Sequence, residues 1–177
     1  YTLETATLKA IKAQSDRLNS TVVIHVAETR KERDDIFAQF GKTPASYLAS
    51  IGFLSDRTIA AHSVWLRPDE IDLYKSYGVG SAHCPTSNMK LASGIAPIPE
   101  MIAKDVAVGL GTDGAASNND LDMWEEMDLA AKLHKVSTND PKFAEPSYEA
   151  LRDAISRDDV VFCDAVVAEV CATVDEV

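Results

Sequence analysis

Amphipathic segments alternate with short apolar runs along most of this chain. Apolar residues recur three or four positions apart in segments that we expect to be helices, at 3–18, 29–40, 43–50, 68–77, 97–104 and 120–134. Between them lie four largely apolar runs that we expect to be strands, at 21–24, 58–61, 78–82 and 106–111. The first of these runs, Thr-Val-Val-Ile, is typical of a strand buried on both faces of a parallel sheet. The polar, turn-rich stretch 84–94 is interpreted as a loop.

Alternating helices and strands indicate an α/β fold with a parallel sheet. No glycine-rich phosphate-binding motif follows any of the strands, which favours a barrel over a dinucleotide-binding fold. A complete (β/α)8 barrel takes about 250 residues, whereas the 177 residues here supply four strand-helix units. We therefore predict the C-terminal half of a TIM-like barrel in residues 1–146, followed by a segment, 147–177, that matches no expected element.

Four polar residues stand just past the predicted strands: His25, His62, His83 and, after Thr112, Asp113. Their separations of 37, 21 and 30 positions each fit one strand plus one helix. Because parallel barrel strands end at one rim, side chains at their C-terminal ends should meet in one pocket. Glu28, three residues after His25, can reach the same pocket. Histidine and carboxylate are natural ligands of zinc or iron, so we expect a divalent metal there.

Composition narrows the choice of partners and compartment. The formal net charge of −11 argues against binding to a nucleic-acid polymer and fits a small neutral or cationic ligand better. Three cysteines without a Cys-x-x-Cys pair give no disulfide framework. No apolar stretch approaches the roughly 20 residues that a bilayer requires, and no signal-peptide pattern opens the chain. We expect a cytoplasmic protein with no membrane partner.

Sequence motifs around the four strand ends carry a resemblance to a known family. The motifs are His25-Val-Ala-Glu28-Thr, Ala61-His62-Ser-Val-Trp-Leu66, His83-Cys-Pro-Thr-Ser-Asn88-Met-Lys-Leu-Ala-Ser-Gly94-Ile-Ala-Pro97 and Gly111-Thr-Asp113-Gly-Ala-Ala-Ser-Asn118-Asn-Asp-Leu-Asp-Met123. In this order they resemble the amidohydrolase superfamily, and within it the 5'-methylthioadenosine/S-adenosylhomocysteine deaminases and the related chlorohydrolases. The resemblance runs from about Thr21 to Pro146.

The resemblance implies one divalent metal ion, with zinc as the first expectation and iron as the alternative. His25 and Asp113 match two of its ligands. The family takes two further ligands from a His-x-His at the end of the first barrel strand, and no His-x-His occurs in this chain. We expect those two ligands to come from a region that precedes the chain.

The resemblance also implies the catalytic and substrate-binding roles. Asp113 would take a proton from the attacking water, and His62 would orient the resulting hydroxide. Glu28 would hydrogen-bond the purine ring and pass the proton to a ring nitrogen. His83 and Asn88 would line the substrate pocket. One acid, one base and one Lewis acid meet the needs of an aromatic amine, which is a poor electrophile until its ring is protonated.

The predicted function is metal-dependent hydrolysis of the exocyclic amine of an adenine nucleoside, such as methylthioadenosine or S-adenosylhomocysteine. One alternative is a chlorohydrolase or aminohydrolase of triazines that uses the same metal site. The other alternative is a non-catalytic fragment that works only when another polypeptide supplies the missing strands. Unpaired sheet edges would favour such association, including a homo-oligomer.

Several other polar and aromatic residues receive purely structural interpretations. Glu126 is expected on the solvated face of its helix with Glu125 and Asp128, and His134 on the helix surface or at its C-terminal dipole. Cys84 has no base paired to it by spacing and is assigned to packing. The remaining assignments are helix capping for Asp120 and Asp122, and core or rim positions for Trp65 and Trp124.

Overall fold

The computed structural model describes residues 2–143 of the chain. Helices and strands alternate along this part, as the apolar pattern predicts. The elements are α1 (Thr5–Leu18), β1 (Val22–Val26), α2 (Arg30–Phe40), α3 (Pro44–Ser50), β2 (Thr58–His62), α4 (Pro68–Tyr77), β3 (Gly80–His83), α5 (Pro85–Lys90), α6 (Ile98–Ala103), β4 (Val108–Leu110) and α7 (Met123–Thr138). The predicted segment 147–177 and its boundary lie outside the described residues.

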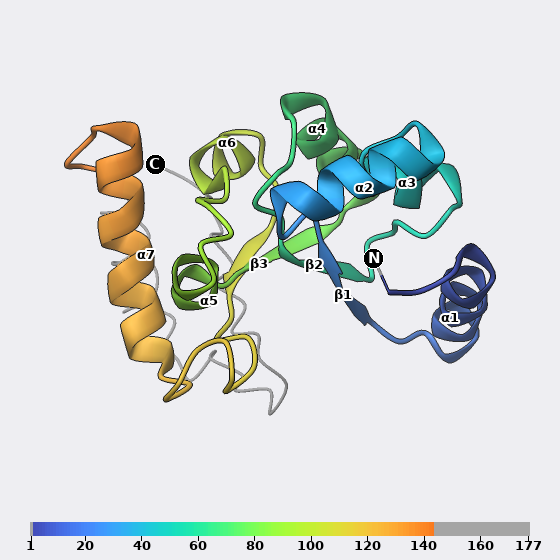
Figure 1. Cartoon of the computed structure of the whole chain (residues 1–177), viewed down its shortest axis with the longest axis horizontal. Coiled ribbons are helices and arrows are strands. Elements are labelled where there is room, and N and C mark those ends of the chain that lie inside the picture. The colour runs from blue at the N-terminus through green and yellow to red at the C-terminus, as the bar shows by residue number, and fades with distance from the viewer. Residues whose placement is uncertain (1, 144–177) are drawn as a thin grey trace, which may run out of the picture.

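The four strands form one parallel sheet in the order β1-β2-β3-β4. Helices α2, α3, α4 and α6 lie along one side of this sheet, and α7 stands beside α5 at the end of the molecule away from α1 (Figure 1). All four strands therefore end at the same edge of the sheet. The α/β prediction with a parallel, barrel-type sheet is confirmed.

The core lies between the sheet and the helices that cover it. Tyr74 and Ile71 of α4 and Met101 of α6 are almost completely buried there, against Val26 and Ala60 of the sheet. Burial of side chains of this size contributes about 1.5–3 kcal/mol each. The core therefore fixes the strands from one side and leaves their C-terminal ends to form the site.

Strand β1 differs from its prediction. Its side chains alternate, with Val22, Ile24 and Val26 packed on the core, whereas Val23 is 53% exposed. The expectation of burial on both faces is wrong for the described residues, because their helices cover one face of β1 and the other face, which carries Val23 and His25, is exposed. His25 also lies inside the strand rather than beyond it.

The segment 84–94 is not only a loop, because it contains the short helix α5. Pro85 occupies the first turn, where its missing N–H costs nothing. The Asn88 N–H then donates to the Cys84 carbonyl over 3.0 Å and closes the turn. The helix places Ser87 and Asn88 in the site described below.

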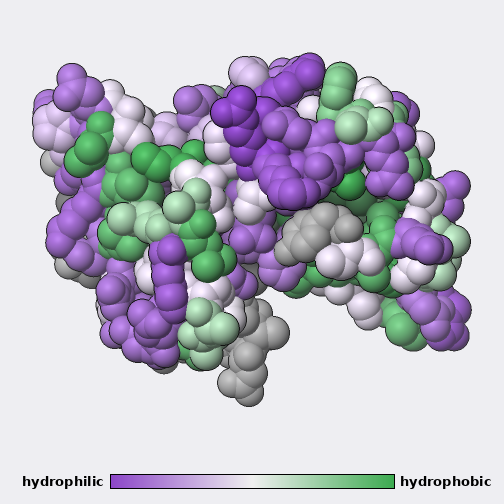
Figure 2. Space-filling model, in the orientation of Figure 1, coloured by the Kyte–Doolittle hydropathy of each residue, from purple (hydrophilic) through white to green (hydrophobic). Residues whose placement is uncertain are grey.

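The surface shown in Figure 2 has a strongly hydrophilic area over α2 and an apolar area around α5 and α6. Half-exposed Met89 belongs to α5, and half-exposed Leu91 and Ile95 belong to the segment that leads from α5 to α6. Among the described residues, no helix combines the length and the apolar character that crossing a bilayer would require.

Candidate metal centre

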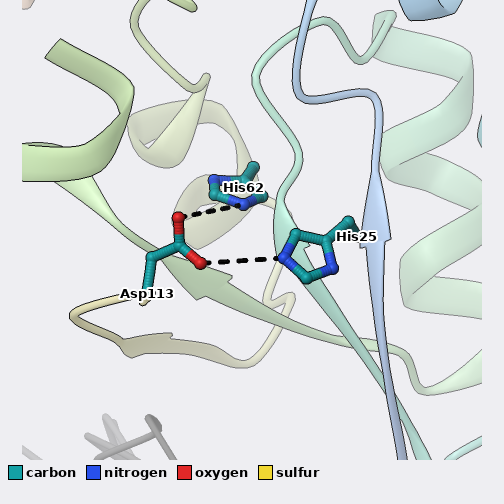
Figure 3. Close-up of side chains that lie close together, drawn as sticks. All are labelled: His25, His62 and Asp113. Carbon is teal, nitrogen blue, oxygen red and sulfur yellow. Dashed lines mark ion pairs between the residues drawn. The ribbon is translucent and has the colours of Figure 1, made fainter. Parts of the chain in front are cut away.

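Three side chains converge beyond the C-terminal ends of the strands. His25 of β1, His62 of β2 and Asp113 of the loop after β4 each point one ligand atom into a common space, and these atoms all lie within 4.8 Å of one another (Figure 3). His25 Nε2 is 3.7 Å from Asp113 Oδ1, and His62 Nε2 is 3.9 Å from Asp113 Oδ2. The sequence places these residues 88 positions apart at most, and the parallel sheet brings them together.

Left-handed backbone conformations turn two of these side chains into the space. His25 is in register with Ala61, so in a regular strand His62 would face the opposite side of the sheet from His25. The φ of +69° at His62 reverses this direction, and the two imidazole centroids are 5.1 Å apart. Asp113 also has a positive φ, of +59°, as do the neighbouring Ala27 and Ser63. Such conformations cost non-glycine residues about 1–2 kcal/mol each, and they are common at functional sites.

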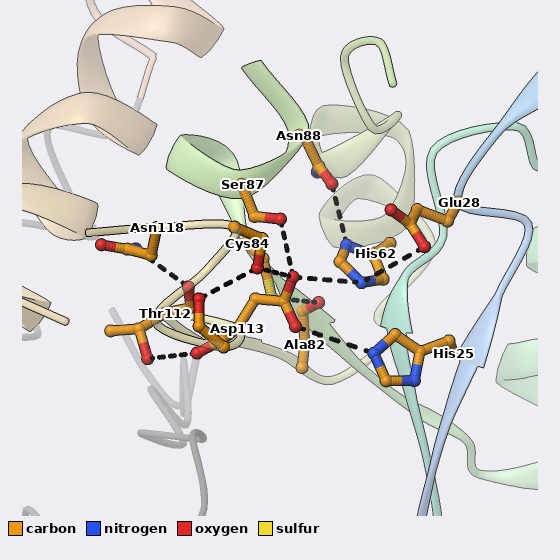
Figure 4. Close-up of polar contacts among 12 residues, drawn as sticks. His25, Glu28, His62, Ala82, Cys84, Ser87, Asn88, Thr112, Asp113 and Asn118 are labelled. Carbon is orange, nitrogen blue, oxygen red and sulfur yellow. Dashed lines mark hydrogen bonds and ion pairs between the residues drawn. The ribbon is translucent and has the colours of Figure 1, made fainter. Parts of the chain in front are cut away.

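Two serine hydroxyls hold the Asp113 carboxylate. Ser87 Oγ donates to Asp113 Oδ2 over 2.7 Å, and Ser117 Oγ donates to the same oxygen over 2.6 Å (Figure 4). Burial raises the pKa of Asp113, but the hydrogen bonds from Ser117 and Ser87 outweigh it and leave the pKa below its usual value. The carboxylate is therefore ionised, with Oδ1 left facing His25. Sequence reasoning gave neither serine a role, although both lie inside the quoted motifs.

His62 is fully buried and hydrogen-bonded on one side only. Its Nδ1 lies 2.9 Å from the Asn88 carboxamide oxygen, which can only accept, so Nδ1 carries the proton in this arrangement. The Nε2 atom then presents a lone pair, is buried and has no hydrogen-bond partner. An unpartnered acceptor beside a carboxylate and a second imidazole suits a cation. Asn88 was predicted to line the substrate pocket; it is 1% exposed and contacts His62.

Glu28 approaches the same space from the loop after β1. Its Oε2 is 3.9 Å from His62 Nε2, and its side chain is 12% exposed. The backbone N–H groups of Ala27 and Glu28 donate to the two carboxylate oxygens of Glu32, over 2.9 and 2.8 Å. Burial is the main cause that raises the pKa of Glu32. Sequence reasoning missed Glu32, although Thr29-x-x-Glu32 has the capping-box pattern that would have indicated it.

His83 and His134 form a buried pair behind the site. Their Nε2 atoms lie 3.0 Å apart, and both residues are 2% exposed or less. Burial lowers the pKa of His83 to about 3, with help from the neighbouring histidines, and lowers that of His134 to about 4. The surface position predicted for His134 is wrong, because the face of α7 that carries it packs towards the strand end at His83.

Glu126 also departs from its prediction, since it is 1% exposed rather than solvated. Its neighbours Glu125 and Asp128 are exposed, as expected. Glu126 and His134 are eight positions apart, which places them on one face of α7, directed inward. A pattern of acidic residues indicates the polar side of a helix, but it cannot show that one of them is buried and hydrogen-bonded inside the protein.

The residues assigned to structural roles largely keep them. Cys84 is buried, and burial is the main cause that raises the pKa of its thiol to about 12, so packing describes it well. The Asp122 side chain caps α7 by accepting from the Trp124 N–H over 2.8 Å. Trp124 is 60% exposed, and Trp65 Nε1 donates to the Ser93 carbonyl over 2.8 Å.

Comparisons with known proteins show which family the chain resembles. The model of the amidohydrolase family matches residues 1–154. A 5-methylthioadenosine/S-adenosylhomocysteine deaminase of Syntrophomonas wolfei is 52% identical over 87% of this chain and 36% of its own length. A 5'-deoxyadenosine deaminase of Methanopyrus kandleri is 48% identical over 92% of this chain and 37% of its own length. The chain therefore spans about a third of the length of these relatives.

Solved structures show the same likeness. An adenosine deaminase from Xanthomonas campestris with bound zinc has a TM-score of 0.81 and 39% identity, over 85% of this chain and 34% of that one. The zinc complex of an atrazine chlorohydrolase from Arthrobacter aurescens has a TM-score of 0.74 and 27% identity, over 78% and 30%. With the family model matching most of its length, the chain belongs to the amidohydrolase family.

Proposed function

We propose that this chain carries part of the active site of a metal-dependent deaminase that hydrolyses the exocyclic amine of an adenine nucleoside. The observation that supports this proposal most directly is the convergence of His25, His62 and Asp113, with Glu28 beside them. The named activities of the deaminase relatives support the choice of an adenine nucleoside, such as methylthioadenosine or S-adenosylhomocysteine.

The donor set fits a divalent metal. His25 Nε2 and Asp113 Oδ1 would hold the ion, and the buried, unpartnered Nε2 of His62 lies beside them. Zinc is the first choice, because two of the similar structures contain it. When bound, the ion supplies Lewis acidity, which can lower the pKa of water to about 7. The two further ligands would come from a His-x-His outside this chain.

The surrounding residues divide the proton transfers between them. Asp113 is ionised and would take one proton from the attacking water at Oδ2, since Oδ1 would hold the ion. Glu28 would pass that proton to a ring nitrogen of the purine, which activates the ring for attack, and the second proton of the water would go to the amine, which leaves as ammonia. His62, held through Nδ1 by Asn88, directs Nε2 at the nucleophile. His83 and Asn88 would shape the wall of the pocket.

The test uses the protein at its natural full length. We expect one equivalent of metal per protein, and ammonia release from methylthioadenosine, S-adenosylhomocysteine or 5'-deoxyadenosine that stops on treatment with a chelator and returns on addition of zinc. A protein that binds metal but releases no ammonia from any of the three would contradict the proposal.

The structural likeness to atrazine chlorohydrolase provides the second candidate function. Chloride release from atrazine, measured beside ammonia release from the nucleosides, separates the two. The same assays on the 177-residue chain alone test whether it is active by itself or needs another polypeptide. A measurement of its molecular mass in solution tests whether it forms a homo-oligomer.

A further inference from the structure

Glu126 is a buried carboxylate that has no cationic partner among the described salt bridges. It lies in the first turns of α7 and is 1% exposed. One of its oxygens accepts from Asn118 Nδ2 over 2.5 Å, and the other accepts from the Thr86 backbone N–H over 3.1 Å. Burying an ionised carboxylate is costly unless hydrogen bonds satisfy it, so its position calls for an explanation.

Both partners of Glu126 are chain neighbours of the serines that bind Asp113. Thr86 precedes Ser87 in α5, and Asn118 follows Ser117 in the loop after β4. The same Asn118 amide also donates to the Thr112 carbonyl over 2.9 Å, directly before Asp113 (Figure 4). Glu126 thus connects the two segments whose hydroxyls meet at Asp113 Oδ2.

We propose that Glu126 is a positioning residue which, through Thr86 and Asn118, fixes Ser87 and Ser117 and so directs the Asp113 carboxylate towards His25. The inference rests on the proposed role of Asp113 as a metal ligand. A carboxylate is suited to this position because both of its partners are donors. A glutamine would offer one acceptor and turn its NH₂ group towards the other donor.

The first test compares Glu126→Gln with Glu125→Gln, the same substitution at the exposed neighbouring residue. In the full-length protein, zinc affinity is measured by competition with a chromophoric chelator, and the site is also examined by the visible absorption of bound cobalt. We expect Glu126→Gln to weaken zinc binding by about tenfold, the lower end of what loss of a direct partner of a ligand costs, and to alter the cobalt spectrum. Glu125→Gln should change neither. Zinc affinity of Glu126→Gln equal to the parent's would overturn the proposal.

The second test asks whether Glu126 acts through the serines. In a Ser87→Ala/Ser117→Ala background the Asp113 carboxylate has lost both hydroxyls, so Glu126→Gln should have less than about a twofold further effect on zinc affinity. A full tenfold effect in this background would mean that Glu126 acts by general stabilisation, and would refute the proposed route. If Glu126→Gln does not fold, Asn118→Ala removes one of the two connections and should weaken zinc binding in the same direction; unchanged binding would count against the proposal.

These outcomes are distinct from those that test the deaminase function. If Glu126→Gln weakens zinc binding but the parent protein releases no ammonia, the positioning role of Glu126 is supported and the deaminase function is refuted. If the parent protein releases ammonia but Glu126→Gln leaves zinc affinity unchanged, the deaminase function is supported and the positioning role is refuted. A parent protein that binds neither zinc nor cobalt would overturn both.

Discussion

Asp113 combines a left-handed backbone with a carboxylate whose two oxygens have different environments. Oδ2 accepts hydrogen bonds from two serines, and Oδ1 faces His25. Aspartate and asparagine tolerate a positive φ better than most residues, because their short polar side chains can hydrogen-bond locally. The left-handed backbone at this position therefore favours aspartate or asparagine, and both can accept hydrogen bonds from the serines. Only aspartate adds the negative charge that a metal ligand needs.

Asp113→Asn should isolate the contribution of that charge. Because asparagine also accepts the left-handed conformation, we expect the fold to be retained, with zinc affinity falling by more than the roughly 10–100-fold that loss of an outer partner costs. Deaminase activity should be lost with it. Metal content and ammonia release are the measurements.

The control is Asp105→Asn, at an exposed aspartate with a φ of +53°. It makes the same chemical change at a similar backbone conformation and should leave both quantities unchanged. Full zinc occupancy and activity in Asp113→Asn would show that this carboxylate is not a ligand.

At the scale of elements, buried carboxylates at helix starts hold the loops that precede them. Glu32 binds the backbone before α2, and Glu70 accepts from the Arg67 and Ser46 N–H groups around α4. Each such bond satisfies a backbone donor that the helix itself cannot. Some of the acidic residues of the chain are therefore buried and hold the backbone, rather than lying on the surface.

Glu32→Gln should weaken the loop that carries Glu28. Glutamine keeps one acceptor for the two N–H groups, so a buried donor loses its partner, at a cost of about 1–3 kcal/mol in the free energy of unfolding. Urea denaturation measures this cost, and the turnover number should fall because Glu28 is less well placed. Asp35→Asn, on the exposed side of the same helix, should change the free energy of unfolding by no more than about 0.5 kcal/mol. It should leave the turnover number unchanged. Equal stability of the two variants would contradict the role of Glu32.

Most of the elements and the meeting of the strand-end residues could be predicted from sequence, but helix α5 and the contacts that hold the site could not. Apolar periodicity located the four strands, and the motifs after them located His25, His62 and Asp113. The hydroxyls of Ser87 and Ser117 carry no periodic signal, since serines are common in loops of every kind. Charged residues are expected at the surface, so the composition of α7 gave no reason to expect an inward-facing acid. The contacts of a side chain depend on how helices pack, which periodicity does not specify.

At the scale of the whole molecule, the histidine pair joins α7 to the sheet. His83 ends β3, and His134 belongs to a helix that starts forty residues later along the chain. Their contact is buried, so both rings are neutral in the folded protein. The contact between α7 and the sheet therefore involves two imidazole rings that are protonated more readily in the unfolded chain than in the folded protein.

This difference predicts loss of stability in acid. Unfolded histidine has a pKa of about 6.5, while the folded values are about 3 for His83 and about 4 for His134. Between these values the unfolded state binds more protons, so the free energy of unfolding should fall as the pH decreases below about 6.5 and keep its full value above it.

His134→Gln removes one of the two groups and should make this slope shallower between about pH 6.5 and pH 4.5. Denaturant unfolding of both proteins at a series of pH values is the measurement. Groups such as Glu32 that titrate nearby are common to both proteins, so they cancel in the difference. Parallel slopes would show that His134 is not held neutral by burial.

The left-handed residues around the site have a consequence for protein engineering. Ala27, His62, Ser63 and Asp113 each adopt a conformation that glycine would accept without penalty. Glycine at fully buried His62 would relieve about 1–2 kcal/mol of backbone strain, but loss of a buried side chain of this size costs about 2–5 kcal/mol. A search for thermostable variants should therefore leave His62 unchanged, because the packing around it outweighs the strain that aims its ring.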